Sequence, residues 1–179
     1  MFPLFLGFFG SSFFENLFNS ANTKDSNFMT DFKMSDEAFK MLAEYEGFRS
    51  KPYMLKGENF YTIGIGSTRL FSSDGSSSRP VKSTDVLTKD QAIFHCKMYY
   101  NNPASPKKNI DDIIKKYGFK LNQRFYDMLC QVSYASNSFS RNKSFYSQFI
   151  GMLQKANGST DVIFLGELLK NTWLSYVKN

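Results

Sequence analysis

The sequence predicts an α+β protein in which a small antiparallel β-sheet lobe lies beside a mostly helical lobe, with a cleft between them. Two observations support this prediction. Polar and apolar residues alternate from Pro52 to Ile65, a pattern typical of two short antiparallel strands. Beyond Thr88, apolar residues recur at helical spacing in several segments that turn-forming residues separate.

The first of these helices is predicted to begin at a capping box formed by Thr88 and Gln91, to run to about Tyr100 and to be broken by Pro103 and Pro106. The further helices are predicted at Ile110 to Tyr117, at Gln123 to Asn137, from Ser144 to near Gly158, and at Val162 to Val177.

A short helix is predicted directly before the strands. Ser35 suits its N-cap position, and Gly47 suits its C-terminal end. Positions i, i+3, i+4 and i+7 of one helix face are occupied by Phe39, Leu42, Ala43 and Glu46. Glu46 therefore shares the apolar face and lies at the negative end of the helix dipole. Since burial and the dipole both penalise an ionised carboxylate, the pKa of Glu46 is expected to be raised.

A carboxyl group that keeps its proton near neutral pH can donate it to a leaving group, so Glu46 is a candidate general acid. The alternative is a solvated glutamate at the edge of the apolar face, extended into water or paired with Arg49. Gly64 and Gly66 interrupt the second predicted strand, where missing side chains let a ligand or another backbone approach closely. The helix and strands together indicate one wall of a cleft that carries an acid.

The segment Glu46-Gly47-Phe48-Arg49, continued through Tyr53 to the run Thr62-Ile63-Gly64-Ile65-Gly66-Ser67-Thr68, resembles the signature of bacteriophage-type lysozymes, the phage endolysin family of muramidases. The segments that begin at Val86 and Gln123 resemble later helices of the same family. The resemblance covers about residues 35–157 and implies a lysozyme-like fold. It also implies that Glu46 is the general acid and Thr62 a catalytic residue. The implied substrate-cleft residues are Tyr53, Gly64, Gly66 and Ser67.

The second catalytic acid of that family is not found at its usual position. The family's common form has an aspartate, sometimes a cysteine, nine residues after the glutamate, where this chain has Leu55. Ser67 replaces a histidine that often follows the last glycine. Glu58, in the predicted turn Lys56–Asn59, is the nearby acidic candidate for the second acid. The alternative for Glu58, which the residues favour, is an exposed turn residue.

The resemblance implies a peptidoglycan-cleaving enzyme that cuts the bond between N-acetylmuramic acid and N-acetylglucosamine. With two carboxylates such an enzyme hydrolyses the bond. With one, the C6 hydroxyl of the substrate attacks the anomeric carbon, as in lytic transglycosylases, and Glu46 serves first as acid and then as base. Leu55 cannot activate water, which slightly favours this single-acid route. Thr62 is expected to hold a water or hydroxyl near the anomeric carbon, or else to be an ordinary β-branched strand residue.

A function from another class stays open. The chain is then a catalytically inactive lysozyme fold, kept as a structural or glycan-binding component of a virus particle. The substitutions at Leu55 and Ser67 would be signs of lost catalysis. The products released from purified cell walls distinguish this hypothesis from both enzymatic ones.

The composition is that of a small enzyme with a sizeable core. The 179 residues suggest one catalytic domain, and the net charge of +6 favours polyanionic surfaces such as bacterial cell walls. No helix-turn-helix, zinc knuckle or stacking motif supports nucleic-acid binding. No cofactor is expected, and the single histidine, His95, has no partner at metal-ligand spacing. Cys96 and Cys130 lie in apolar helical patterns, which predicts buried free thiols and leaves a disulfide open.

Residues 1–27 are predicted to form a separate hydrophobic segment and linker, and residues 28–179 the catalytic domain. Residues 1–18 contain seven phenylalanines, no basic side chain and one acid, Glu15. The uncharged run is too short to span a bilayer. Its spacing predicts an amphipathic helix that lies in a membrane interface or docks on a partner, the alternative being a cover for the domain's own core. A virion or membrane-associated protein that acts on the host cell wall is therefore expected.

Overall fold

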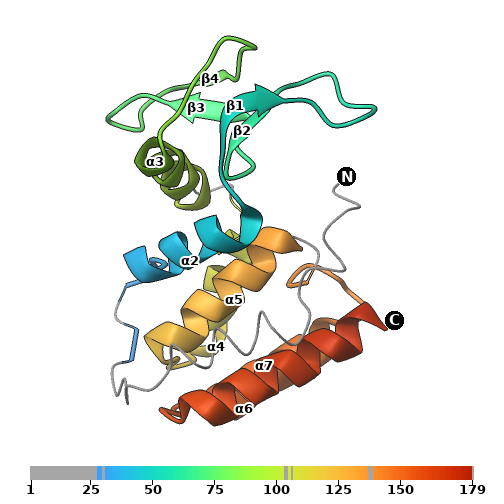
Figure 1. Cartoon of the computed structure of the whole chain (residues 1–179). Helices are drawn as coiled ribbons and strands as arrows, with labels where there is room; N and C mark the ends of the chain where they lie inside the picture. Colours follow the sequence, from blue (N-terminus) through green and yellow to red (C-terminus); the bar gives the residue numbers. More distant parts are fainter. Residues whose placement is uncertain (1–27, 30, 103–104, 106, 137–138, 179) are drawn as a thin grey trace. The chain divides into compact units, whose positions relative to one another are not determined.

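The computed structural model describes residues 28–29, 31–102, 105, 107–136 and 139–178, which form helices and two two-stranded antiparallel sheets (Figure 1). The predicted α+β class is confirmed. The chain divides into two compact units. We call Asp36–Ser105 the sheet unit, and the described residues before and after it the helical unit. The expected cleft between lobes and the domain boundary at residues 27 and 28 stay predictions.

The sheet unit combines short strands with two flanking helices. Its described elements are α2 (Asp36–Glu46), β1 (Arg49–Tyr53), β2 (Thr62–Gly64), β3 (Arg69–Phe71), β4 (Ser78–Pro80) and α3 (Lys89–Tyr100). β1 pairs with β2 and β3 pairs with β4, both antiparallel. The first two strands are shorter than the alternation predicts, because the connection between them, residues 54–61, extends on both sides of a turn closed by the hydrogen bond from Glu58 N to Leu55 O.

Helix α3 supports the rest of the sheet unit. It begins as the sequence predicts, with a capping box in which Gln91 N donates to Thr88 Oγ1 at 3.2 Å and Thr88 N donates to Gln91 Oε1 at 2.8 Å. One face buries Ala92, Cys96 and Tyr100. The helix packs against α2 and against strands β2 and β3.

Gly64 allows β2 to approach α3 closely. Its φ is +69°, a left-handed conformation that favours glycine. A Cβ atom at this position would lie 2.9 Å from the Cβ of Ala92, closer than two carbon atoms pack. Gly64 is buried. The missing side chain at Gly64 could admit a ligand or another part of the backbone, and the structure shows that it admits helix α3.

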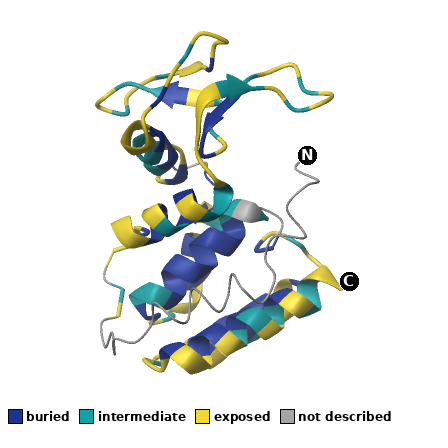
Figure 2. Cartoon of the chain, in the orientation of Figure 1, coloured by how far each residue is buried: buried dark blue, intermediate teal, exposed yellow. Residues whose placement is uncertain are grey.

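The helical unit is built around one buried helix. Its described elements are α4 (Lys107–Tyr117), α5 (Gln123–Ala135), α6 (Tyr146–Ala156) and α7 (Val162–Val177). Figure 2 shows that α5 is buried along most of its length, whereas α7 buries one stripe. Helix α7 packs against α5 and α6, and its Trp173 ring lies 5.3 Å from that of Phe139. The predicted bounds of α7 are confirmed.

Two helices of this unit begin at residues that differ from the prediction. The sequence predicts α4 from Ile110, but the helix begins at Lys107. Its first turn is polar, so apolar spacing does not mark where the helix begins. Helix α6 was expected at Ser144 but begins at Tyr146. The side chain of Asn142 accepts hydrogen bonds from Ser144 N and Oγ, which holds Ser144 in the preceding turn.

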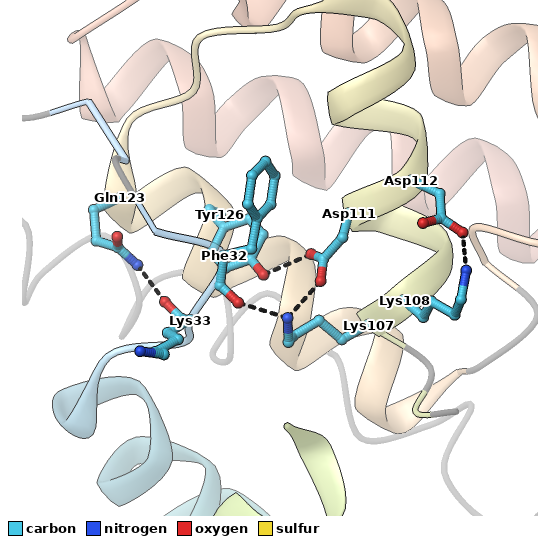
Figure 3. A network of polar contacts seen from close by, with 8 residues as sticks. All are labelled: Phe32, Lys33, Lys107, Lys108, Asp111, Asp112, Gln123 and Tyr126. Carbon is cyan, nitrogen blue, oxygen red and sulfur yellow. Dashed lines mark hydrogen bonds and ion pairs between the residues drawn. The ribbon is translucent and has the colours of Figure 1, made fainter. Parts of the chain in front are cut away.

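A buried polar network joins the segment before α2 to α4 and α5 (Figure 3). Lys107 Nζ donates to Asp111 Oδ2 at 2.5 Å and to the carbonyl of Phe32 at 2.6 Å. Tyr126 Oη donates to the other carboxylate oxygen, Asp111 Oδ1, at 2.7 Å. Lys107 and Asp111 are both buried, so the ion pair and its added hydrogen bonds compensate for the loss of water around two charges.

Two of the predicted features lie in parts of the chain that the structure does not describe. The amphipathic segment of residues 1–18 and the helix-breaking Pro103 and Pro106 lie outside the described residues. Within them, no helix combines the length and apolar character needed to cross a bilayer. Cys96 and Cys130 are buried free thiols.

Lys107→Met should lower the free energy of unfolding by about 3–5 kcal/mol, because it leaves the Asp111 carboxylate buried without its cation. Lys108→Met is the matched control, since Lys108 pairs with Asp112 at the same i,i+4 spacing on the exposed side of α4 (Figure 3). Its loss should cost less than about 1 kcal/mol. Urea denaturation measures both variants, and equal effects would contradict the assignment of the network as structural.

Candidate active site

Glu46 ends helix α2, and its side chain is half-buried. Its helix face is buried as predicted, through Phe39, Leu42 and Ala43. Burial raises the pKa of Glu46 from 4.5 to about 7. The raised pKa expected from the sequence is therefore present, with burial as its physical cause. At neutral pH a large fraction of this carboxyl group carries a proton.

Arg49 does not neutralise Glu46. Among the described residues no ion pair joins the two side chains, which excludes that alternative for Glu46. The guanidinium carbon of Arg49 instead lies 4.3 Å from the ring centroid of Tyr53, on the same strand β1. This is the distance of a cation–π contact. The cation is thereby directed at an aromatic face rather than at the carboxyl group.

Tyr53 lies within electrostatic range of two acidic side chains. Burial raises the pKa of its phenol, the charge of Arg49 lowers it, and the charges of Glu46 and Glu58 raise it further. The charges of both carboxyl groups therefore act on one half-buried phenol. Thr62 is the residue paired with Tyr53 across β1 and β2. Tyr53 thus links three other residues that the sequence singled out, Glu46 and Glu58 through electrostatic influence and Thr62 through strand pairing.

Glu58 is not the exposed turn residue that the sequence favours. Its backbone N–H donates to the carbonyl of Leu55 at 3.0 Å, in a turn whose third residue, Gly57, has a φ of +89°. The residue is half-buried. Its Oε2 is shielded from solvent and has no hydrogen-bond partner among the described residues. A buried acceptor without a partner is rare in folded proteins and is found preferentially where function requires it.

The other expected site residues occupy different environments. Thr62 is 3 % exposed, so its side chain is part of the packed face of β2. Gly66 is exposed, and with Gly64 and Ile65 it forms a tight loop closed by Ile63 and Ser67, each donating its N–H to the carbonyl of the other at 2.9 Å. Ser67 is half-buried. Gly64 is packed against α3, as described above, and its buried position does not suit a substrate-cleft residue.

No metal-ligand cluster accompanies these groups. Among residues 28–29, 31–102, 105, 107–136 and 139–178, no group of three or more His, Cys, Asp or Glu side chains could hold a metal ion. His95 is buried, and its Nδ1 accepts a hydrogen bond from Phe71 N at 3.1 Å. It therefore joins α3 to β3. The partial burial of Glu58 is the feature that the sequence does not predict, because no local pattern marks the burial of a turn residue.

The chain is similar to one phage enzyme of known structure. A crystal structure of a mutant of P22 lysozyme matches 79% of this chain and 97% of its own, with 22% sequence identity and a TM-score of 0.45. No protein-family model and no curated protein matches the sequence.

The burial of Glu46 predicts a specific dependence of stability on pH. Below pH 4.5 the carboxyl group is protonated in both the folded and the unfolded chain, so its burial costs little. As the pH rises from 4.5 to about 7, the unfolded chain releases the proton first, and the folded state loses stability. The loss levels off above pH 7 at about 3 kcal/mol, the energy equivalent of this pKa change.

The variant Glu46→Gln isolates this contribution. Urea denaturation should show that, as the pH rises from 4.5 to about 7, the unfolding free energy of the wild type falls relative to that of the variant. Above about pH 7 the difference between the two proteins should stay constant. Glu44→Gln, at an exposed position of α2, is the control and should show little change in this range. A difference for Glu46→Gln that does not vary with pH would contradict the burial of the carboxyl group.

Proposed function

We propose that this protein is a peptidoglycan-cleaving muralytic enzyme of the phage-lysozyme type, with Glu46 as general acid. The observation that carries the proposal is a carboxyl group at the end of α2 whose burial raises its pKa to about 7. Such a group can protonate the glycosidic oxygen at neutral pH. The motif around Glu46 and Thr62 supports peptidoglycan as substrate, with cleavage between N-acetylmuramic acid and N-acetylglucosamine.

Two reaction routes are compatible with this acid. Leu55 stands where a second catalytic acid is expected, which favours the single-acid transglycosylase route. Glu58 favours hydrolysis by two carboxylates, because it is half-buried, has a carboxylate oxygen without a described partner, and acts electrostatically on Tyr53 as Glu46 does. In that route Glu58 activates water or stabilises the developing positive charge. Tyr53 positions the substrate or the water, and the buried Thr62, paired with it across β1 and β2, supports Tyr53 from the packed face.

Glu46→Gln should reduce the clearing of purified cell walls by about a hundredfold or more, because the amide cannot donate a proton to the leaving group. Turbidity measures the rate, and thermal melting followed by circular dichroism shows that the variant is folded. Glu44→Gln is the control on the same helix and should retain the wild-type rate. The wild-type rate should fall above about pH 7 as Glu46 ionises. Wild-type clearing by Glu46→Gln would end the proposal.

The products and a second variant separate the routes. Mass spectrometry of the released fragments should show reducing ends if the enzyme hydrolyses the bond, and Glu58→Gln should then lose activity as well. Anhydro sugars together with an active Glu58→Gln variant would instead establish the single-acid route. Intact glycan after incubation with the wild-type protein would favour the catalytically inactive, glycan-binding alternative.

We also propose that the protein reaches the host cell wall as part of a virion or attached to a membrane through residues 1–18. Their phenylalanine-rich amphipathic pattern supports this proposal. Removal of residues 1–27 should abolish sedimentation with zwitterionic lipid vesicles, which do not attract the positive charge of the remaining chain, and leave the clearing of cell walls unchanged. A truncated chain that still sediments would refute the membrane assignment, and a chain that no longer folds would favour the alternative that the segment covers the core.

A further inference from the structure

A concave site lies on the helical unit. A pocket of about 470 Å³ is lined by Asn109, Ser140, Arg141, Lys143 and Tyr146. This volume lies within the usual range of small-ligand sites, about 300–1,000 Å³. All five residues belong to the helical unit, whereas Glu46 and Glu58 belong to the sheet unit. The pocket therefore shares no lining residue with the unit that carries Glu46 and Glu58.

The pocket has an excess of positive charge. Arg141 and Lys143 are exposed, and neither forms an ion pair with any described residue. The carboxylates that follow Asn109 most closely on α4 are already paired, Asp111 with Lys107 and Asp112 with Lys108. Both cations are thus available to an anionic ligand.

The loop that carries the cations is held in place. It runs between Phe139 and Phe145, whose side chains are buried and whose ring centroids lie 5.8 Å apart. Asn109 Nδ2 donates to the carbonyl of Ser140 at 2.5 Å, which fixes the loop to α4. The hydrogen bonds from Ser144 to Asn142 Oδ1 stabilise the turn that follows. A site whose walls are fixed before binding loses less entropy when the ligand arrives.

Two further polar groups belong to the pocket wall. Ser140 is 2 % exposed, and its hydroxyl has no hydrogen-bond partner among the described residues. Tyr146 is exposed and shares a hydrogen bond with Tyr117, which orients its ring. An unsatisfied buried hydroxyl next to two unpaired cations is a combination that folding alone does not explain.

We propose that this pocket binds a phosphate group carried on a sugar or polyol unit of an anionic cell-wall polymer. The Arg141 guanidinium offers a planar pair of donors to phosphate oxygens, and Lys143 adds a second positive charge. The side-chain amide of Asn109 is a third donor. The volume leaves room for the attached sugar or polyol, against which the ring of Tyr146 can pack. The pocket would hold the protein on the wall independently of cleavage.

The probe for this proposal is poly(glycerol phosphate), titrated into the full chain at about 0.15 M salt by isothermal titration calorimetry. Arg141→Gln combined with Lys143→Gln should weaken binding at least tenfold. Lys120→Gln combined with Lys155→Gln removes the same charge from exposed positions of the helical unit outside the pocket. That control should weaken binding less than twofold. All substituted side chains are exposed, and thermal melting verifies that both variants are folded.

Three results would overturn the proposal. One is the absence of binding to the polymer, and another is an equal loss of affinity in the control, which would reveal non-specific attraction. The third is an equal loss of affinity, in the variant that combines Arg141→Gln and Lys143→Gln, for a soluble peptidoglycan fragment that carries carboxylates and no phosphate. Because the experiment measures binding rather than cleavage, its failure leaves the role of Glu46 untouched. Conversely, an inactive Glu46→Gln variant says nothing about the pocket.

Discussion

The close packing of β2 on α3 at Gly64 is the constraint on which the candidate active site depends. The left-handed backbone and the short distance to Ala92 both exclude a side chain there. Since α3 also packs against α2, one helix supports both the carboxyl group of Glu46 and the strand that carries Thr62. A side chain at position 64 would push β2 away from α3 and alter the spacing among the acidic groups.

Buried carboxyl groups in the two units have opposite environments. Asp111 is buried with the ammonium of Lys107 and the hydroxyl of Tyr126, so its charge is compensated and its role is structural. Glu46 is half-buried and forms no ion pair with a described residue, and its partial burial raises its pKa. Glu58 has a buried oxygen without any described partner. Uncompensated groups reduce stability, and proteins retain them mainly where chemistry needs them.

The distribution of charge is consistent with a division of tasks between the units. In the proposals above, the sheet unit cleaves glycan with carboxyl groups, and the helical unit binds an anionic polymer with unpaired cations. The net charge of +6 favours the approach of the whole chain to polyanionic surfaces. Only Arg141 and Lys143, fixed beside a pocket, would convert that general attraction into recognition of one group.

The sequence by itself determined the features that depend on neighbouring residues. The capping box at Thr88 and Gln91, the bounds of α7 and the place of Glu46 on a buried helix face all follow from helix periodicity and capping. Only the tertiary structure decided the burial of Glu58, the packing role of Gly64 and the pocket between Asn109 and the loop at Arg141. These depend on contacts between residues distant in sequence, and no local spacing records which side chain another element will cover.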